Sequence, residues 1–361
     1  MMVERTSSPI EPNPTSAATY AQLVDIIDRE VSSFRSFRDC YFETHPSASQ
    51  ADYVRQLKER AAVLLQDVPL ASSETTIRVM NALLCGKILN VLPDYEPKCE
   101  EYLTKAVKLD PDSVESLNEL GECLWKKPDR RLAKKCFEMA LEKRENAVSL
   151  RSLSTALRQD QCGVEDKVDR IRQSVQLANK AVQLDNTDDQ SWYILGNAYL
   201  TYFFCTGQVV GSHIHNALSA YAKAVELGCC SADLYYNYAQ AQKYEQDYAA
   251  ALYSLTRSFT LDPTFIEAKD ALTNLKNFLK RLSEAIERKG KLRPKRVQEL
   301  CASFNPDADL GPYAKPIVDL QTGKATKFNP VSLSGLKCGA NPDHLVLVKV
   351  IASVVNEETL P

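Results

Sequence analysis

A small set of charged and aromatic residues in the middle of the chain could recognise a peptide. Arg151 and Arg158 carry guanidinium groups, whose planar geometry suits two-point binding of a carboxylate. Asp233 and Glu267 could bind a cationic side chain, and each charge-assisted hydrogen bond would contribute about 1.5–3 kcal/mol. These residue types predict a site for a short extended peptide that carries both charge signs. Aromatic and amide groups would complete it: Tyr193, Asn197 and Tyr236.

The sequence shows no pattern for catalysis or for a cofactor. We find no nucleophile with a base and an orienting group, and no Gly-rich phosphate loop. His213 and His215 could chelate a metal, but no Cys or carboxylate stands at ligand spacing, so loop histidines are the better interpretation. We therefore expect no catalytic residue, no metal and no cofactor.

Composition argues for a protein of the cytoplasm and nucleus. The 361 residues contain 44 Lys+Arg and 47 Asp+Glu, a net charge of −3, which leaves no bulk attraction for nucleic acid or membrane. Eleven Cys without a signal peptide or CxxC spacing indicate reduced thiols, most of them in place of small apolar residues in helices. No apolar run reaches the roughly 18 residues of a membrane span, since Lys349 interrupts the longest one.

An internal repeat sets the elements that must position the candidate residues. Leu117, Leu120, Gly121 and Phe137 follow the 34-residue tetratricopeptide (TPR) pattern, in which small residues allow two helices to approach closely. Five copies, at about residues 72–264, predict five helix pairs that stack into an all-α superhelix. The first helix of each other copy is marked by Gly86, by Leu150, Leu153 and Ser154, by Trp192, Leu195 and Gly196, and by Tyr235, Tyr238 and Ala239.

The first helix of each pair forms the inner wall of such a superhelix, and the candidate residues fall on its inward positions. The alternative for any one of them is a solvated helix face or an ion pair within the array. Arg158 is the most sensitive position, because a register error of one residue would rotate it by about 100° away from the wall.

The flanks of the array divide the chain into five segments. Period-3.6 apolarity predicts helices before the array and a capping helix after it, near residues 269–286. The expected segments are a disordered N-terminus (1–19), N-terminal helices (20–71), the superhelix with its cap (72–287), a basic linker (288–305) and a small β segment (306–361).

Two features lie beyond the cap. The segment 288–296 holds six cations in nine residues, which favours contact with RNA phosphate or a nuclear import signal; the alternative is a solvated helix end and linker. Short β-type runs at 316–320 and 344–355 resemble the opening of a small β domain. One or two strands cannot close a barrel, so we expect this domain to be truncated or incompletely folded.

Three blocks give the chain a more specific resemblance. From about residue 20 onward the chain resembles the tetratricopeptide repeat protein 5 family, also called the Strap or stress-responsive coactivator family. The blocks are Ser-Phe-Arg-Asp-Cys-Tyr-Phe-Glu-Thr-His at 36–45, Leu-Asn-Val-Leu-Pro-Asp-Tyr at 89–95, and Ser-Trp-Tyr-Ile-Leu-Gly-Asn at 191–197 with Thr206-Gly207 downstream.

The resemblance implies a TPR superhelix followed by an OB-fold domain, and two roles. One is ribosome-associated recognition of the N-terminal peptide of nascent tubulin, which triggers co-translational tubulin mRNA decay (tubulin autoregulation) through an adaptor and a deadenylase complex. The alternative is a nuclear scaffold that assembles a histone acetyltransferase coactivator complex in the DNA-damage response, with an actin-nucleating partner.

The resemblance also implies roles for single residues. Arg158, Asp233 and Glu267 match the family's peptide-binding positions, and Arg293 and Lys295 match its ribosome-contacting cations. The tubulin peptide begins Met-Arg-Glu, so its Glu would meet Arg158 and its Arg would meet Asp233 or Glu267. We therefore expect a non-enzymatic adaptor. A co-chaperone clamp for C-terminal carboxylates is a weaker alternative, because the two acidic residues oppose it.

Overall fold

The computed structural model describes residues 17–69, 74–159, 167–208, 210–288, 292–303, 305, 310–318, 325–331, 333–337, 341 and 343–348. The chain separates into two compact units, Met1–Leu272 and Thr273–Pro361. The boundary between them falls inside helix α14 (Ile266–Glu287).

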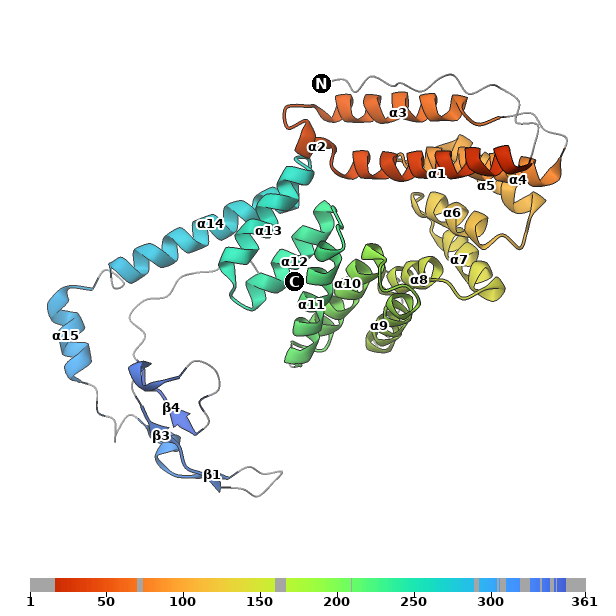
Figure 1. Cartoon of the computed structure of the whole chain (residues 1–361). Coiled ribbons are helices and arrows are strands. Elements are labelled where there is room, and N and C mark those ends of the chain that lie inside the picture. The colour runs from red at the N-terminus through yellow and green to blue at the C-terminus, as the bar shows by residue number, and fades with distance from the viewer. Residues whose placement is uncertain are drawn as a thin grey trace. The chain divides into compact units, whose positions relative to one another are not determined.

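Five consecutive helix pairs form most of the first unit, which confirms the predicted TPR superhelix (Figure 1). The two helices of a pair pack together, and the second helix of each pair contacts the first helix of the next. Buried apolar side chains accordingly form three clusters in succession, as expected where each repeat contacts its neighbours. The pairs are α4 (Thr75–Asn90) with α5 (Pro97–Leu109), α6 (Val114–Trp125) with α7 (Arg131–Lys143), α8 (Ala147–Gln159) with α9 (Lys167–Leu184), α10 (Asp189–Cys205) with α11 (Gly211–Glu226), and α12 (Ala232–Tyr244) with α13 (Tyr248–Leu261).

The repeat pattern has its expected physical cause in the close approach of paired helices. A Cβ atom added to Gly121 would lie 2.5 Å from Cε1 of Phe137, and one added to Gly196 would lie 2.5 Å from Cε1 of Tyr221. Both aromatic side chains are fully buried. Only a residue without a side chain leaves room for these rings, so glycine fixes the spacing within these two pairs.

Side-chain caps define where four of the array helices begin. In each, a side-chain oxygen accepts a hydrogen bond from the backbone N–H three residues later, which contributes about 1 kcal/mol. The capping residues are Ser113 for α6, Asp188 for α10, Ser231 for α12 and Asp247 for α13.

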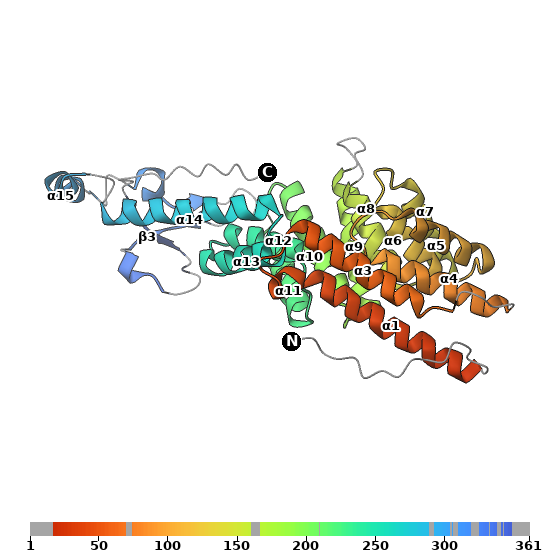
Figure 2. The ribbon, with the colours of Figure 1, turned by 90° about the horizontal axis from the view of Figure 1, so that it is seen from above.

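The predicted N-terminal helices are present, together with a short helix that the sequence did not predict. Helix α1 (Ala17–Asp39) runs beside α3 (Gln50–Gln66), as both views show (Figures 1 and 2). Helix α2 (Tyr41–Thr44) follows α1 and packs against α13, while α1 packs against α4. We call residues 17–44, helices α1 and α2, the strap, because they reach from the first repeat to the last.

Three ion pairs fix the strap at both ends of the array. At the first repeats, Asp28 Oδ1 lies 2.8 Å from Lys87 Nζ of α4, and Arg35 Nη2 lies 2.9 Å from Glu119 Oε1 of α6. At the last repeat, both oxygens of Glu43 accept hydrogen bonds from Arg257 of α13, at 2.7 and 2.9 Å. The strap therefore connects repeats that are far apart in the sequence.

The structure corrects the expectation of loop histidines. His213 and His215 lie in the first two turns of α11, which begins at Gly211. The His213 ring lies 4.4 Å from the Tyr202 ring, and His215 Nδ1 lies 2.6 Å from the Gly211 carbonyl oxygen. Both histidines therefore lie in a helix and not in a loop, and each imidazole has a contact within this helix pair.

The second unit contains the rest of α14, a helix and short β ladders. Helix α15 (Pro294–Ala302) occupies much of the segment expected as a basic linker. Strands β1 (Ile317–Val318) and β2 (Ala325–Thr326) pair antiparallel, and β3 (Asn329–Pro330) and β4 (His344–Leu345) pair parallel. Short 3₁₀ helices lie at Gly311–Ala314 and Leu333–Gly335. The predicted OB-type start stays a prediction, because part of the run 344–355 lies outside the described residues.

The helices that the structure describes are each too short or too polar to cross a lipid bilayer. Nine cysteines in the described ranges are free thiols, five of them buried.

Candidate peptide-binding site

Arg158 near the end of α8 is a cation that has only neutral partners. Its Nη1 donates hydrogen bonds to the hydroxyl oxygens of Ser154 and Ser174, both at 2.8 Å. Its Nη2 donates to Thr155 Oγ1 at 3.2 Å. Removal from water lowers the pKa of Arg158 to about 10, so it stays charged at neutral pH. Within the described parts of the chain no carboxylate pairs with it, so its charge is available to an acidic ligand.

The departure of the third repeat from the TPR pattern creates this environment. Ser154 occupies the position that Gly121 and Gly196 hold in neighbouring repeats. Instead of a large ring, it faces Ser174 of α9, and its hydroxyl donates to the Ser174 carbonyl oxygen at 2.9 Å. Two fully buried hydroxyl groups thus replace the usual glycine–aromatic contact. They hold the Arg158 guanidinium in place without neutralising it.

Tyr193 of α10 is influenced by both this cation and an acidic group. Burial raises the pKa of Tyr193 above its usual value, and Asp233 raises it further, while Arg158 acts in the opposite direction. Both charges therefore act on the same hydroxyl. The neighbouring Asn197 accepts hydrogen bonds from the Tyr221 hydroxyl at 2.8 Å and from Asn237 Nδ2 at 3.1 Å, which fixes the orientation of its amide.

The acidic end of the site contains three carboxylates. Burial raises the pKa of Asp233 in the first turn of α12, and Asp262 and Glu267 raise it further. Asp262 Oδ1 accepts two hydrogen bonds from Thr264, whereas neither Asp233 nor Glu267 forms an ion pair with any cation that the structure describes. Mutual repulsion of carboxylates disfavours their ionised form, and a bound cation would relieve it.

Tyr236 and Arg151, which were also predicted to contact the peptide, have partners within the fold. The Tyr236 ring lies 5.0 Å from the Phe265 ring, next to the start of α14. Arg151 Nη1 lies 2.6 Å from Asp188 Oδ2, and its Nη2 lies 3.9 Å from Glu122 Oε1. Arg151 therefore has the ion pairs within the array that the sequence left open as an alternative, and Asp188 is also the cap of α10.

A large polar cavity lies between the strap and the array. Its volume is about 1250 Å³, and its walls carry charges of both signs. Of the predicted peptide contacts, Arg151 and Asp233 line this cavity. Arg158, Tyr193 and Asn197 instead form a group with Tyr221, and Asp233 with Asp262 and Glu267 forms the acidic group at the last repeat.

Sequence reasoning did not identify all the groups that build the site. It used Ser154 only to mark the first helix of the third repeat, and it did not consider Asp262 or the Tyr221 hydroxyl. The available signal was the pair of serines, one on each helix of the third pair, at positions where the other repeats have small apolar residues. An exception in both helices of one pair indicates a polar pocket between them.

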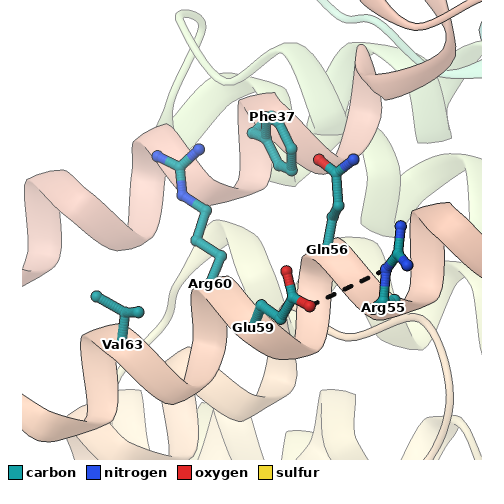
Figure 3. Close-up of a pocket in the computed structure, with 6 residues that line it drawn as sticks. All are labelled: Phe37, Arg55, Gln56, Glu59, Arg60 and Val63. Atoms are coloured by element: carbon teal, nitrogen blue, oxygen red, sulfur yellow. Dashed lines mark ion pairs between the residues drawn. The ribbon is translucent and has the colours of Figure 1, made fainter. Parts of the chain in front are cut away.

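A second, shallower pocket lies between α1 and α3 (Figure 3). Its volume is about 430 Å³. The Arg60 guanidinium lies 4.9 Å from the centre of the Phe37 ring and donates to Ser33 Oγ at 3.1 Å. Arg60 contributes a cation–π contact between α1 and α3, and this pocket contains none of the predicted peptide contacts.

Arg293 and Lys295 lie at the start of α15. Arg293 is the cap residue, Lys295 lies in the first turn, and both side chains are exposed. Cations at a helix N-terminus oppose the helix dipole, so their placement does not serve the stability of α15. Arg296 in the same turn pairs with Glu299 at 3.1 Å. Residues 289–291 of the basic run lie outside the described residues.

Stacked helix pairs with unpaired charges on their first helices define a TPR adaptor or scaffold, a class that is typically non-enzymatic. The chain is 39% identical over 335 residues to tetratricopeptide repeat protein 5 of Homo sapiens, which covers 92% of this chain and 76% of the relative. It is 40% identical over 329 residues to the Mus musculus protein, covering 90% and 74%. The chain therefore belongs to the tetratricopeptide repeat protein 5 family.

No family model matches the chain. The TPR protein YrrB, described as having an unusual peptide-binding site, is 21% identical with a TM-score of 0.36 and covers 55% of this chain and 91% of its own. TTC0263 of Thermus thermophilus, also a TPR protein, is 15% identical with a TM-score of 0.44 and covers 55% and 98%.

Proposed function

We propose that this protein captures the N-terminal peptide of nascent tubulin at the ribosome and initiates decay of the tubulin mRNA. The observation that carries the proposal is the pair of uncompensated charges in the array. Arg158 has only neutral partners, and Asp233 and Glu267 have no cation among the residues described. A ligand with one acidic and one basic side chain would neutralise both.

The order of charges in the peptide fits this arrangement. In Met-Arg-Glu the guanidinium would bind Asp233 and Glu267, and the carboxylate would bind Arg158. Adjacent residues of an extended chain are about 3.3 Å apart, and their side chains point to opposite sides. Arg158 and Asp233 both act on the hydroxyl of Tyr193, so the proposed peptide would lie along α10 between them.

The exposed cations of α15 supply the proposed contact with the ribosome. Arg293 and Lys295 would bind ribosomal RNA phosphates, in a chain whose net charge is slightly negative. The TPR array would then present the captured peptide to an adaptor that brings a deadenylase complex to the mRNA. In this role the protein acts in the cytoplasm.

The proposal is tested by a pull-down with ribosomes that translate a tubulin N-terminus. We expect capture of the wild-type peptide and loss of capture when its Arg and Glu are exchanged. Arg158→Ala should also lose capture while its circular dichroism spectrum stays unchanged. Arg172→Ala is the matched control, because Arg172 is an exposed cation of α9 that contacts Asp169 and the Tyr202 hydroxyl and none of the proposed peptide contacts. Equal capture of both peptides would contradict the proposal.

Charge reversal at Arg293 and Lys295 tests the ribosome contact separately. We expect release from sedimenting ribosomes with free-peptide affinity unchanged, because neither residue belongs to the peptide site. Arg131→Glu is the control, since Arg131 is an exposed cation paired with Asp129. Retention on ribosomes would contradict this contact. Binding of coactivator proteins by a variant that captures no tubulin peptide would favour the nuclear scaffold instead.

A further inference from the structure

Two cysteines meet where the strap contacts the end of the array. Cys40 lies between α1 and α2, and Cys230 lies in the turn between α11 and α12. Both are partly exposed, and both line the 1250 Å³ cavity. The two thiol groups lie close enough for Cys230 to raise the pKa of Cys40. Solvent and small solutes can therefore reach a pair of adjacent thiols.

The surrounding contacts hold this pair together. Helix α2 packs on α13, and the two hydrogen bonds between Glu43 and Arg257 lie three residues beyond Cys40. The Arg257 guanidinium also lies 6.0 Å from the centre of the Tyr235 ring on α12, the helix that follows Cys230. The approach of the two thiols is thus built into the docking of the strap.

We propose that Cys40 and Cys230 form an oxidation site, at which hydrogen peroxide joins them in a reversible disulfide that fastens the strap to the fifth repeat. The disulfide would close a loop of about 190 residues and fix the wall of the cavity on the side of the last repeat. This site is independent of the proposed peptide recognition.

The chemistry assigns a different part to each thiol. Burial and the neighbouring Cys230 raise the pKa of Cys40 to about 11, so Cys40 keeps its proton at neutral pH and serves as the second, resolving thiol. The Cys230 thiolate attacks one peroxide oxygen and breaks the O–O bond, which gives a sulfenic acid and, after protonation, one water. Cys40 sulfur then attacks the sulfenic sulfur, and the S–O bond breaks with release of a second water. Two thiols lose two electrons to one peroxide.

The same chain contains a natural control for proximity. Cys99 and Cys123 also lie close enough to shift each other's pKa, but each is only 1% exposed within the packed first repeats, and the Cys99 thiol donates to the Gly86 carbonyl oxygen at 3.3 Å. Peroxide has no access to this pair, so closeness alone should not oxidise it. Cys229, beside Cys230 in the sequence, is likewise 1% exposed, and its sulfur accepts a hydrogen bond from Gln190 Nε2 at 3.4 Å.

The test is peptide mapping of the full chain after treatment with hydrogen peroxide, without reduction. We expect one cross-linked peptide that contains Cys40 and Cys230, loss of two free thiols, and recovery of both with dithiothreitol. The unfolding midpoint should rise by roughly 5–10 °C, because the cross-link constrains the unfolded chain. Cys230→Ser and Cys40→Ser should each abolish the cross-link.

Three control variants assign the bond. Cys229→Ser should keep it, which separates the two neighbouring cysteines that share one proteolytic fragment, and Cys301→Ser should have no effect because Cys301 lies on the exposed α15. Cys40→Ala should melt at the same temperature as the wild-type protein before peroxide treatment. Loss of the cross-link in this variant would then not reflect loss of the fold. A bond between Cys99 and Cys123, a bond through Cys229, or oxidation of single thiols without a bond would overturn the proposal.

Discussion

Charged side chains on the inner wall form ion pairs in the first repeats of the array, whereas Arg158 and Asp233 in the later repeats do not. In the first repeats, Lys87 pairs with Asp28 and Glu115, and Glu119 pairs with Arg35. The change falls within the third repeat, where Arg151 of α8 still pairs with Asp188. In the later repeats, Arg158 contacts only hydroxyl and carbonyl groups, and Asp233 has a raised pKa beside two other carboxylates. Similar residue types thus stabilise the fold in one half and remain available for binding in the other.

The strap accounts for much of this difference. Its Asp28 and Arg35 neutralise charges on α4 and α6, so the inner wall of the first repeats already has a partner. At the last repeat the strap reaches α13 through Glu43 instead, and it does not pair with Asp233 or Glu267. The position of the strap therefore explains why the charges of the first repeats are neutralised and those of Asp233 and Glu267 are not.

The largest expected effect is a loss of stability when an ion pair between the strap and the first repeats is removed. Glu119 is 8% exposed and accepts hydrogen bonds from Arg35 and Asn90. Glu119→Ala would remove the carboxylate that pairs with Arg35 and leave Asn90 only its bond to the backbone oxygen of residue 119, so it should lower the free energy of unfolding by about 2–3 kcal/mol, as measured by urea denaturation. Peptide affinity should not change. Glu138→Ala, at an exposed pair with Lys134, should cost less than about 0.5 kcal/mol. Loss of peptide binding in Glu119→Ala alone would contradict the division into two halves.

A smaller effect is expected from a change of pH. It tests whether Asp233, in the later repeats, is available to bind the peptide. A raised pKa means that folded Asp233 binds protons more readily than the unfolded chain. Stability from this group should therefore fall as pH rises from about 3.9, the usual value, through the raised pKa. Affinity for a Met-Arg-Glu peptide should rise several-fold over the same window, since the guanidinium needs the ionised carboxylate. Titration calorimetry at several pH values checks this.

Two variants make the pH result interpretable. Asp233→Asn should flatten the profile, whereas Asp112→Asn, at a distant surface pair with Lys143, should not. Arg158 does not contribute to the profile, because its pKa of about 10 lies well above the window. Affinity that is independent of pH in the wild-type protein would remove Asp233 from the peptide site.

The fold followed from the sequence because its signal is repeated. Gly121 and Gly196 mark positions that only a small residue can occupy, and each defines a helix pair locally. The strap could not be predicted in the same way. Its contacts, such as Glu43 with Arg257, join segments about 210 residues apart, and nothing in the local pattern of either segment indicates the other.

The site was predictable only in part for the same reason. Inward-facing positions identified Arg158, Asp233 and Arg151 as candidates of equal standing. Whether a charge is free depends on its neighbours in space: Arg151 faces the cap residue Asp188, whereas Arg158 faces Ser174. The periodicity of one chain does not contain that information, although the paired serines of the third repeat were a sign of it.

The central claim is that Arg158 is an uncompensated cation that binds the acidic residue of the peptide. Titration calorimetry with a Met-Arg-Glu peptide and with its Met-Arg-Gln analogue, each against wild-type protein and Arg158→Ala, tests it most directly. The account predicts that wild type loses about tenfold or more in affinity with the Gln analogue, as expected for a charge-assisted hydrogen bond of about 1.5–3 kcal/mol. It also predicts that Arg158→Ala binds both peptides equally weakly. The same preference for Glu over Gln in both proteins would contradict the claim.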